Sequence, residues 1–302
     1  MEDIILPSYT LKYSREDPND IFSEEHRRCY QPDTLSLFVI PDPNISYTCS
    51  EDRKSKGFDY IHKIVLKIRR HPEALDILKE YLEAFPEKIN CQNNEGYTAL
   101  MLACENSGTK STDETVEYIL KHPNININLT DKYGHTALHL ACENSNTKRT
   151  LELLLEHSDI NVNLINDWGW TPLHNACSNY DPDIAEYMIK LLLAHFDINV
   201  NLQNEDGYTA LHLTCVEYDE DSISEKLTKL LLDKTIVNVN LQNRWGDTAL
   251  HCLCEDFNKE RTTALFLSHH TIDINLQNIC GHTALHKACE IGNIKAVEML
   301  LN

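Results

Sequence analysis

The chain has 302 residues, of which 42% are hydrophobic and 8% aromatic, so it can bury a core and wholesale disorder is excluded. Its 47 acidic and 27 basic residues give a formal charge of −20. That charge argues against binding nucleic acid or an anionic membrane, because both need clustered Lys and Arg. It permits a basic protein partner.

The N-terminal sequence MEDIILPSYT is acidic and has a short apolar run, unlike a secretory signal. No run of 18 apolar residues predicts a membrane span. The 11 cysteines are an odd number without a compact spacing framework. We therefore expect reduced thiols and a cytoplasmic location, with the nucleus as the other compartment that fits.

Residues 1–56 contain five prolines, many charges and no repeated phrase. One apolar run, LSLFVI at 35–40, is bounded by prolines and predicts a strand. Three interpretations stay open for this segment. It is a partly disordered tail, a small element packed on the domain that follows, or a recruitment module such as an F-box, for which the apolar pattern is weakest. Next in the chain, ALDILKEYLEAF at 74–85 predicts a helix.

From Gly96 onward one phrase recurs six times, as GYTALMLAC, GHTALHLAC, GWTPLHNAC, GYTALHLTC, GDTALHCLC and GHTALHKAC. Its glycines are Gly96, Gly134, Gly169, Gly207, Gly246 and Gly281, spaced by 38, 35, 38, 39 and 35 residues. Six positions before each glycine stands an asparagine, preceded by Ile or Val. These asparagines are Asn90, Asn128, Asn163, Asn201, Asn240 and Asn275. Such self-similarity is typical of a solenoid.

These phrases resemble the ankyrin repeat, whose unit is a turn plus two helices with a T-P-L-H-x-A core. The resemblance covers 96–302 and implies an all-α ankyrin-repeat solenoid, with a helix-turn-helix and a β-hairpin in each repeat. We interpret 57–95 as a degenerate N-terminal capping repeat, because Gly57 and His62 fall in register and Leu82 lies fourteen residues before Gly96. The predicted domains are thus a 1–56 non-repeat segment and a 57–302 repeat domain.

A weaker resemblance, carried by INVNLQN and HTALHLACENS, is to the long ankyrin proteins of giant DNA viruses, and implies a host protein as partner and the host cytoplasm as location.

The period of the repeat varies, and we place the variation in the turn between the two helices. The last leucine of each second helix lies fourteen residues before the next glycine, so the extra residues fall upstream of it. Loops tolerate such insertions better than packed elements do. The acidic stretch EYDEDSISE at 217–225 is accordingly expected to be a solvated loop.

The repeated residues have structural interpretations. The glycine suits a turn with positive φ, the threonine two residues later suits a helix N-cap, and the leucine after that suits the core. The repeated asparagine is expected to satisfy backbone groups between neighbouring hairpins.

His139 and Cys142 lie one helical turn apart in HTALHLACEN, as metal ligands or a nucleophile and its base would. The resemblance implies instead that this histidine bonds near the capping threonine and braces the next repeat. The family usually has alanine where this chain has cysteine, and a buried cysteine packs as a small apolar residue. Because the pair recurs in register, we favour packing and predict no catalytic residue, no cofactor and no metal.

By the same resemblance, hairpin tips and first helices line a concave groove where a partner binds. The candidate residues at the tips are Tyr97, Tyr133, Trp168, Trp170, Tyr208 and Trp245, and those at the first-helix ends are Glu105, Glu143, Glu255 and Glu290. Tip aromatics are either interface anchors or braces between hairpins, and the acids are either solvated or selective for a basic segment. We predict a monomeric, non-enzymatic protein-interaction scaffold. The alternatives are a substrate-recruiting adaptor of a ubiquitin ligase that uses residues 1–56, and an enzyme or metal protein built on the His–Cys pairs.

Overall fold

The computed structural model describes residues 59–144, 147–218 and 220–302, all within a compact unit that spans Ser55–Asn302. The three interpretations of residues 1–56 and the predicted strand at 35–40 lie outside the described residues, as does Gly57.

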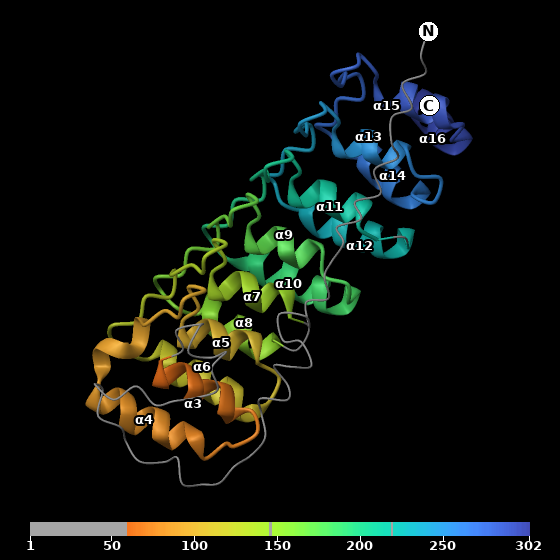
Figure 1. Cartoon of the computed structure of the whole chain (residues 1–302). Helices are drawn as coiled ribbons and strands as arrows, with labels where there is room; N and C mark the ends of the chain where they lie inside the picture. The colour runs from red at the N-terminus through yellow and green to blue at the C-terminus, as the bar shows by residue number, and fades with distance from the viewer. Residues whose placement is uncertain (1–58, 145–146, 219) are drawn as a thin grey trace. The chain divides into compact units, whose positions relative to one another are not determined.

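Seven helix pairs follow one another in chain order (Figure 1). They are α3 Tyr60–Ile68 with α4 Ala74–Ala84, α5 Ala99–Glu105 with α6 Lys110–Leu120, α7 Ala137–Glu143 with α8 Lys148–Leu155, α9 Pro172–Cys177 with α10 Pro182–Ala194, α11 Ala210–Val216 with α12 Asp221–Leu232, α13 Ala249–Cys254 with α14 Glu260–Leu267, and α15 Ala284–Ile291 with α16 Ile294–Leu301. A 3₁₀ helix, η3 Pro86–Asn90, follows α4. Each first helix packs on the next first helix, and from α6 onward each second helix packs on the next second helix, which confirms the all-α solenoid.

The first helices begin where the threonines are, because each threonine closes a reciprocal cap. Thr171 Oγ1 accepts a hydrogen bond from the His174 amide at 3.3 Å, and His174 Nδ1 accepts one from the Thr171 amide at 3.1 Å. The histidine thus takes the part that Glu or Gln has in a common capping box. In α3 the cap is Asp59, and His62 fills the histidine position. The degenerate first copy therefore keeps the cap with a different acceptor.

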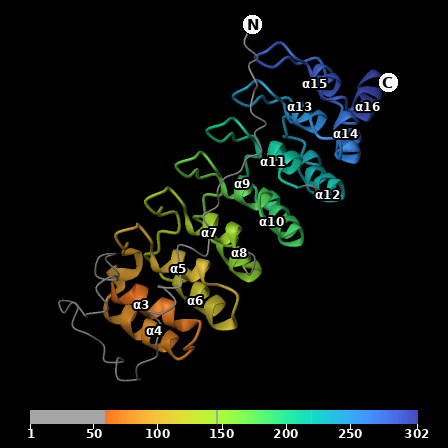
Figure 2. The ribbon, with the colours of Figure 1, turned by 45° about the vertical axis from the view of Figure 1, so that its right-hand side comes forward.

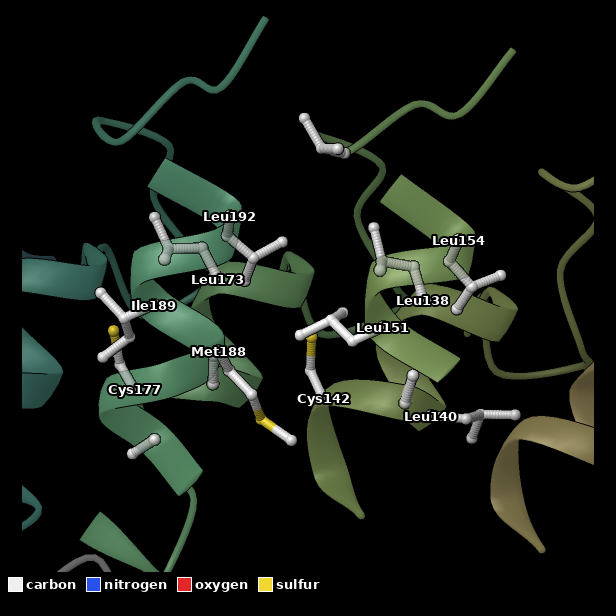
Figure 3. Packing of buried hydrophobic residues seen from close by; sticks show 14 of the residues in the cluster. Leu138, Leu140, Cys142, Leu151, Leu154, Leu173, Cys177, Met188, Ile189 and Leu192 are labelled. Atoms are coloured by element: carbon white, nitrogen blue, oxygen red, sulfur yellow. The ribbon is translucent and has the colours of Figure 1, made fainter. Parts of the chain in front are cut away.

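The core lies between the two helix layers and contains the repeated leucines and cysteines. Figure 3 shows Cys142 and Cys177 among the leucine and isoleucine side chains of α7 to α10. Cys104, Cys142, Cys177 and Cys254 are fully buried, whereas Cys289 in the last described repeat is exposed. All nine cysteines within the described ranges are free thiols. Their burial among apolar side chains supports the packing interpretation.

The prediction that the turn between the helices varies in length is wrong. In the five repeats from α5 to α14 this turn stays short, while the second helix changes length. α8 and α14 have 8 residues, α6 has 11, α12 has 12 and α10 has 13. The increments are near one helical turn, about 3.6 residues. An added turn keeps the apolar face of the helix pointing at the core, so a packed element accommodates the insertion.

The stretch at 217–225 is also not a solvated loop. Tyr218 is buried and its hydroxyl donates to the Asn179 carbonyl at 2.7 Å. Asp221 begins α12, and its carboxylate accepts from the Arg261 amide at 2.7 Å and the Thr262 hydroxyl at 2.6 Å. Asp221 therefore joins two consecutive repeats, a role that composition does not reveal.

Candidate protein-binding surface

The hairpins that follow the second helices carry the glycines, and they project from one side of the stack (Figure 2). Each is closed by a buried Asn or Asp three residues before its glycine. In the hairpin of Gly207, the Asn204 amide donates to the Tyr208 carbonyl at 2.9 Å, and Asn204 Oδ1 accepts from the amides of Asp206 at 3.1 Å and Tyr208 at 2.8 Å. The sequence interpretation missed this residue, although it recurs as Asn93, Asp131, Asn166, Asn204, Asn243 and Asn278.

Backbone hydrogen bonds join each hairpin to the next one. The Arg244 amide donates to the Asp206 carbonyl at 2.9 Å. Gly207 has φ +78°, and a Cβ there would lie 2.7 Å from the Arg244 nitrogen and the Asn243 Cα, so glycine is needed both for its conformation and for the close approach.

The repeated asparagines add a second set of links, as predicted. Asn201 Nδ2 donates to the Ile236 carbonyl at 2.7 Å, and Asn201 Oδ1 accepts from the Asn238 amide at 2.7 Å. The same pair of bonds starts from Asn90, Asn128, Asn163 and Asn240. The hairpins therefore form a row held in fixed register.

The predicted tip aromatics differ in how far they are exposed to solvent. Tyr133 and Trp168 precede their glycines and are 44% and 42% exposed. Tyr97, Trp170 and Tyr208 follow their glycines and are half-buried against the core. These three side chains are therefore only partly exposed.

Neighbouring tips also contact each other. The rings of Tyr133 and Trp168 stack with centroids 5.8 Å apart, and those of Tyr208 and Trp245 meet edge-on at 5.9 Å. Trp245 is half-buried, and the Arg244 guanidinium lies 4.4 Å from the centre of its ring. These contacts support the brace interpretation for part of each ring, while Tyr133 and Trp168 still present a free aromatic surface.

The recurring histidine joins its own cap to the next hairpin. Because His139 Nδ1 accepts from the Thr136 amide at 3.1 Å, the proton of the neutral ring lies on Nε2, which donates to the Trp170 carbonyl at 3.0 Å. The equivalent bonds run from His62 to Tyr97, His174 to Tyr208, His212 to Asp247 and His251 to His282. Met101 holds this position in α5 and cannot donate such a bond.

Burial shifts both members of the His–Cys pairs away from reactivity. It lowers the pKa of His139, His174 and His212 to about 4. It raises the pKa of the Cys215 and Cys254 thiols to about 12, and that of Cys142 well above its ordinary value. A cysteine that acts as a nucleophile or a metal ligand needs to be a thiolate, and burial opposes the formation of that thiolate. Within the described residues, no three His, Cys, Asp or Glu side chains are grouped to hold a metal ion.

Two of the predicted acids lie near the histidines that follow repeat glycines. The distance from His135 Nε2 to Glu143 Oε1 is 4.0 Å, and from His282 Nδ1 to Glu290 Oε2 it is 3.8 Å. Glu255 forms an ion pair with Lys287. Glu105 is half-buried, and burial, followed by the charges of Glu143 and Asp131, raises its pKa to about 7.

We call this set the tip surface. It consists of Tyr97, Tyr133, Trp168, Trp170, Tyr208 and Trp245 together with Glu105, Glu143, Glu255 and Glu290. Over the described ranges, no helix combines the length and apolar character needed to cross a bilayer.

Comparison with known families decides what kind of repeat this is. The family pattern described as ankyrin repeats, in three copies, matches residues 65–166, 145–235 and 220–302. The chain belongs to the ankyrin-repeat family. Ankyrin repeats indicate a protein–protein interaction domain, and their fold is typically a non-catalytic module.

Solved ankyrin structures share the fold at low sequence identity. The ankyrin-repeat domain of Bcl-3, a member of the IkappaB protein family, has a TM-score of 0.64 and 22% identity, over 82% of this chain and 100% of that one. An ankyrin-repeat protein named EF0377 has a TM-score of 0.56 and 22% identity, over 67% of this chain and 96% of its own. An ankyrin-repeat domain from Acinetobacter baumannii AYE has a TM-score of 0.56 and 24% identity, over 67% and 95%. No curated protein matches the chain.

Proposed function

We propose that the protein is a non-enzymatic scaffold and that its tip surface binds a protein partner. The observation that carries this proposal is the exposure of Tyr133 and Trp168, at 44% and 42%, on neighbouring hairpins. Large aromatic side chains dominate the energy of many protein interfaces. Their exposure on a row that the backbone already holds in register favours a binding role.

The rigidity of the hairpins supports binding as well as stacking. Asparagine side chains and backbone amides join each hairpin to the next, so a partner would meet a surface that needs little ordering. Less conformational entropy is then lost on association. Half-buried Trp170 and Tyr208 continue the aromatic surface between the exposed tips and the core. The centre of the tip surface therefore suits an apolar side chain of the partner.

A non-enzymatic role is supported by the state of the recurring His–Cys pairs. Both nitrogens of His139 are engaged in hydrogen bonds, and burial lowers its pKa to about 4, so it is a poor base at neutral pH. Burial also raises the pKa of Cys142 well above its ordinary value. The pairs are better explained as links in the stack.

The test is partner capture by the full chain carrying Tyr133→Ala and Trp168→Ala, compared with a matched control. Phe196 is 87% exposed and follows a second helix, away from the hairpin tips, so Phe196→Ala removes a similar ring from another surface. We expect the double variant to lose at least about 2 kcal/mol of binding free energy and the control to bind as the wild type does. Equal binding by all three proteins would contradict the proposal, provided that thermal melting shows each to be folded.

The ubiquitin-ligase adaptor remains the alternative role. It rests on residues 1–56, which lie outside the described residues, and it predicts that removing them severs a ligase link while the tip surface keeps its partner.

We further propose a monomer that binds no nucleic acid and acts in the cytoplasm or nucleus, which the net charge of −20 and the unpaired thiols support. A host protein as partner, in the host cytoplasm, remains the expectation from the resemblance to viral proteins.

A further inference from the structure

Three carboxylates gather where the hairpin of Gly134 meets the ends of α5 and α7. Glu105 ends α5, Glu143 ends α7, and Asp131 closes the hairpin. His135 lies close to two of them, with Nδ1 3.2 Å from Asp131 Oδ2 and Nε2 4.0 Å from Glu143 Oε1, and both of these acids raise the pKa of Glu105. We call these three residues the α5–α7 acid cluster.

Two members of the cluster have polar partners within the chain. Asp131 accepts hydrogen bonds from the amides of Tyr133 at 2.9 Å and His135 at 2.8 Å, and from His135 Nδ1 at 3.2 Å. Glu143 accepts from Asn175 Nδ2 at 2.8 Å. Glu105 differs, because its Oε2 is closed off from solvent and has no hydrogen-bond partner among the described residues. Leaving a buried carboxylate oxygen unpaired is costly.

The repeat register shows which group Glu105 lacks. Glu105, Glu143 and Glu255 stand nine residues after their glycines, and the residue six after the next glycine faces Glu143 and Glu255. For Glu255 that residue is Lys287, which forms an ion pair with it, and for Glu143 it is Asn175. For Glu105 the corresponding residue is Leu140, which has no polar side-chain atom. The chain thus supplies a donor at the two equivalent positions and an apolar side chain at this one.

We infer that the α5–α7 acid cluster holds a lysine or arginine side chain of the protein segment bound on the tip surface. This inference rests on the proposed function. Because Glu105 as a whole is only half-buried, a guanidinium or ammonium group on the tip surface would lie against this residue and offset the mutual repulsion of the three carboxylates. The neighbouring Tyr97 ring, half-buried beside Glu105, gives the aliphatic part of such a side chain an apolar contact. The partner is therefore a basic segment that also carries an apolar anchor for Trp168 and its neighbours.

Proton release gives this contact a signature that a merely structural acid would not show. Burial and the two neighbouring acids raise the pKa of Glu105 to about 7, and a bound cation would lower it, so binding should strengthen as the pH rises. The other groups that face the cluster are His135, Tyr97 and the buried thiol of Cys104. When His135 gains a proton at low pH, its positive charge repels the bound cation. His135 therefore also makes binding weaker as the pH falls. If the bound cation returned the pKa of Glu105 to its ordinary value of 4.5, the affinity would fall at least about tenfold between pH 8 and pH 5.5.

The probe for this test is a random peptide library displayed on phage and selected against the full chain at pH 8. We expect the enriched peptides to share a lysine or arginine beside an apolar residue. Synthetic peptides in which norleucine replaces that lysine, or citrulline that arginine, should bind at least about tenfold more weakly. Glu105→Gln should weaken the parent peptide similarly and reduce the pH dependence of its affinity. Glu156→Gln is the control, because this acid follows α8, its side chain is 68% exposed and it is not part of the tip surface, and it should bind as the wild type does.

Failure of this inference can be told apart from failure of the proposed function. Peptides that need Tyr133 and Trp168 but neither a basic residue nor Glu105 would overturn the inference and leave the tip surface as the binding site. Peptides that bind the Tyr133→Ala, Trp168→Ala variant as well as the wild type would contradict the proposed function itself. Thermal melting of Glu105→Gln guards against misfolding, and a second variant, Glu143→Gln, should give a loss in the same direction.

Discussion

Lowering the pH should decrease the free energy of unfolding of the repeat domain, because its buried histidines then gain protons more readily in the unfolded chain. Replacing one of these histidines should remove that residue's share of the loss. His174 is the test case, because it is nearly fully buried and both ring nitrogens are hydrogen-bonded. Its Nδ1 accepts from the Thr171 amide, so a proton added there repels that N–H and removes one of the two bonds of the cap. The variant His174→Met has a precedent in the chain, since Met101 fills the same position of α5.

The size of the effect follows from the pKa difference between the folded and unfolded states. Burial lowers the pKa of His174 to about 4 from an ordinary value of 6.5, so the unfolded chain binds more protons between these values. Stability is therefore lost as the pH falls below 6.5, by about 2 kcal/mol for this residue at pH 5. His139 and His212 have the same shift, which makes the total about 6 kcal/mol. Glu105 acts in the opposite direction over the same range and offsets about 2 kcal/mol.

The assay is urea denaturation of the wild type and of His174→Met at several pH values from 8 to 5. At pH 8 the variant should be about 1–3 kcal/mol less stable, because the Tyr208 carbonyl loses its donor. Between pH 8 and pH 5 its free energy of unfolding should fall by about 2 kcal/mol less than that of the wild type. His286→Met, at the same position but exposed, is the control. Equal losses in the wild type and in His174→Met would refute the reasoning, as would an imidazole of His174 that titrates near 6.5 by NMR.

Three further predictions concern stability. Gly207→Ala should be more destabilising than Gly281→Ala by about 1–3 kcal/mol in chemical denaturation. Both glycines have positive φ, but a Cβ at position 207 would collide with the next hairpin, whereas a Cβ at position 281 would meet nothing within 4 Å. Equal losses of stability would mean that the close approach at Gly207 does not matter. Cys215→Ala should cost about 0.5–1.5 kcal/mol and Leu211→Ala about 2–5 kcal/mol, and a cysteine as costly as the leucine would contradict its role as a small packing residue. Glu105→Gln should stabilise the protein by about 1–3 kcal/mol at pH 8 and have little effect at pH 5. The reason is that the raised pKa leaves Glu105 charged, and therefore costly to bury, only when the pH is above that pKa. A stability gain that is the same at both pH values would argue against a buried charge.

The repeated residues made most of the fold predictable. Each of the threonine, leucine and glycine positions recurs six times, so its role could be read from local rules for caps, cores and turns. The histidine bonds to the next hairpin were expected from the family resemblance, and the structure gives them a direction and a tautomer. Length variation was misplaced because three or four inserted residues look like a loop, while in space they form one more turn of α6, α10 or α12.

The tip surface was predictable as a set of residues but not in its exposure. Tyr133 and Trp170 look equivalent in sequence, since each adjoins a repeat glycine, yet they lie on opposite sides of it and only Tyr133 is exposed. The unpaired oxygen of Glu105 depends on Leu140 in the following repeat, a contact between units that no single phrase reveals. Such features come from how repeats meet rather than from what each repeat contains.

Site-specific photo-crosslinking tests most directly whether a protein partner binds the tip surface. A photoreactive phenylalanine analogue would replace Tyr133 in one variant and Phe196 in another, both of which are exposed aromatic positions. We predict that the analogue at position 133 crosslinks the captured partner and that the analogue at position 196 does not. Crosslinking from position 196 with none from position 133 would contradict it.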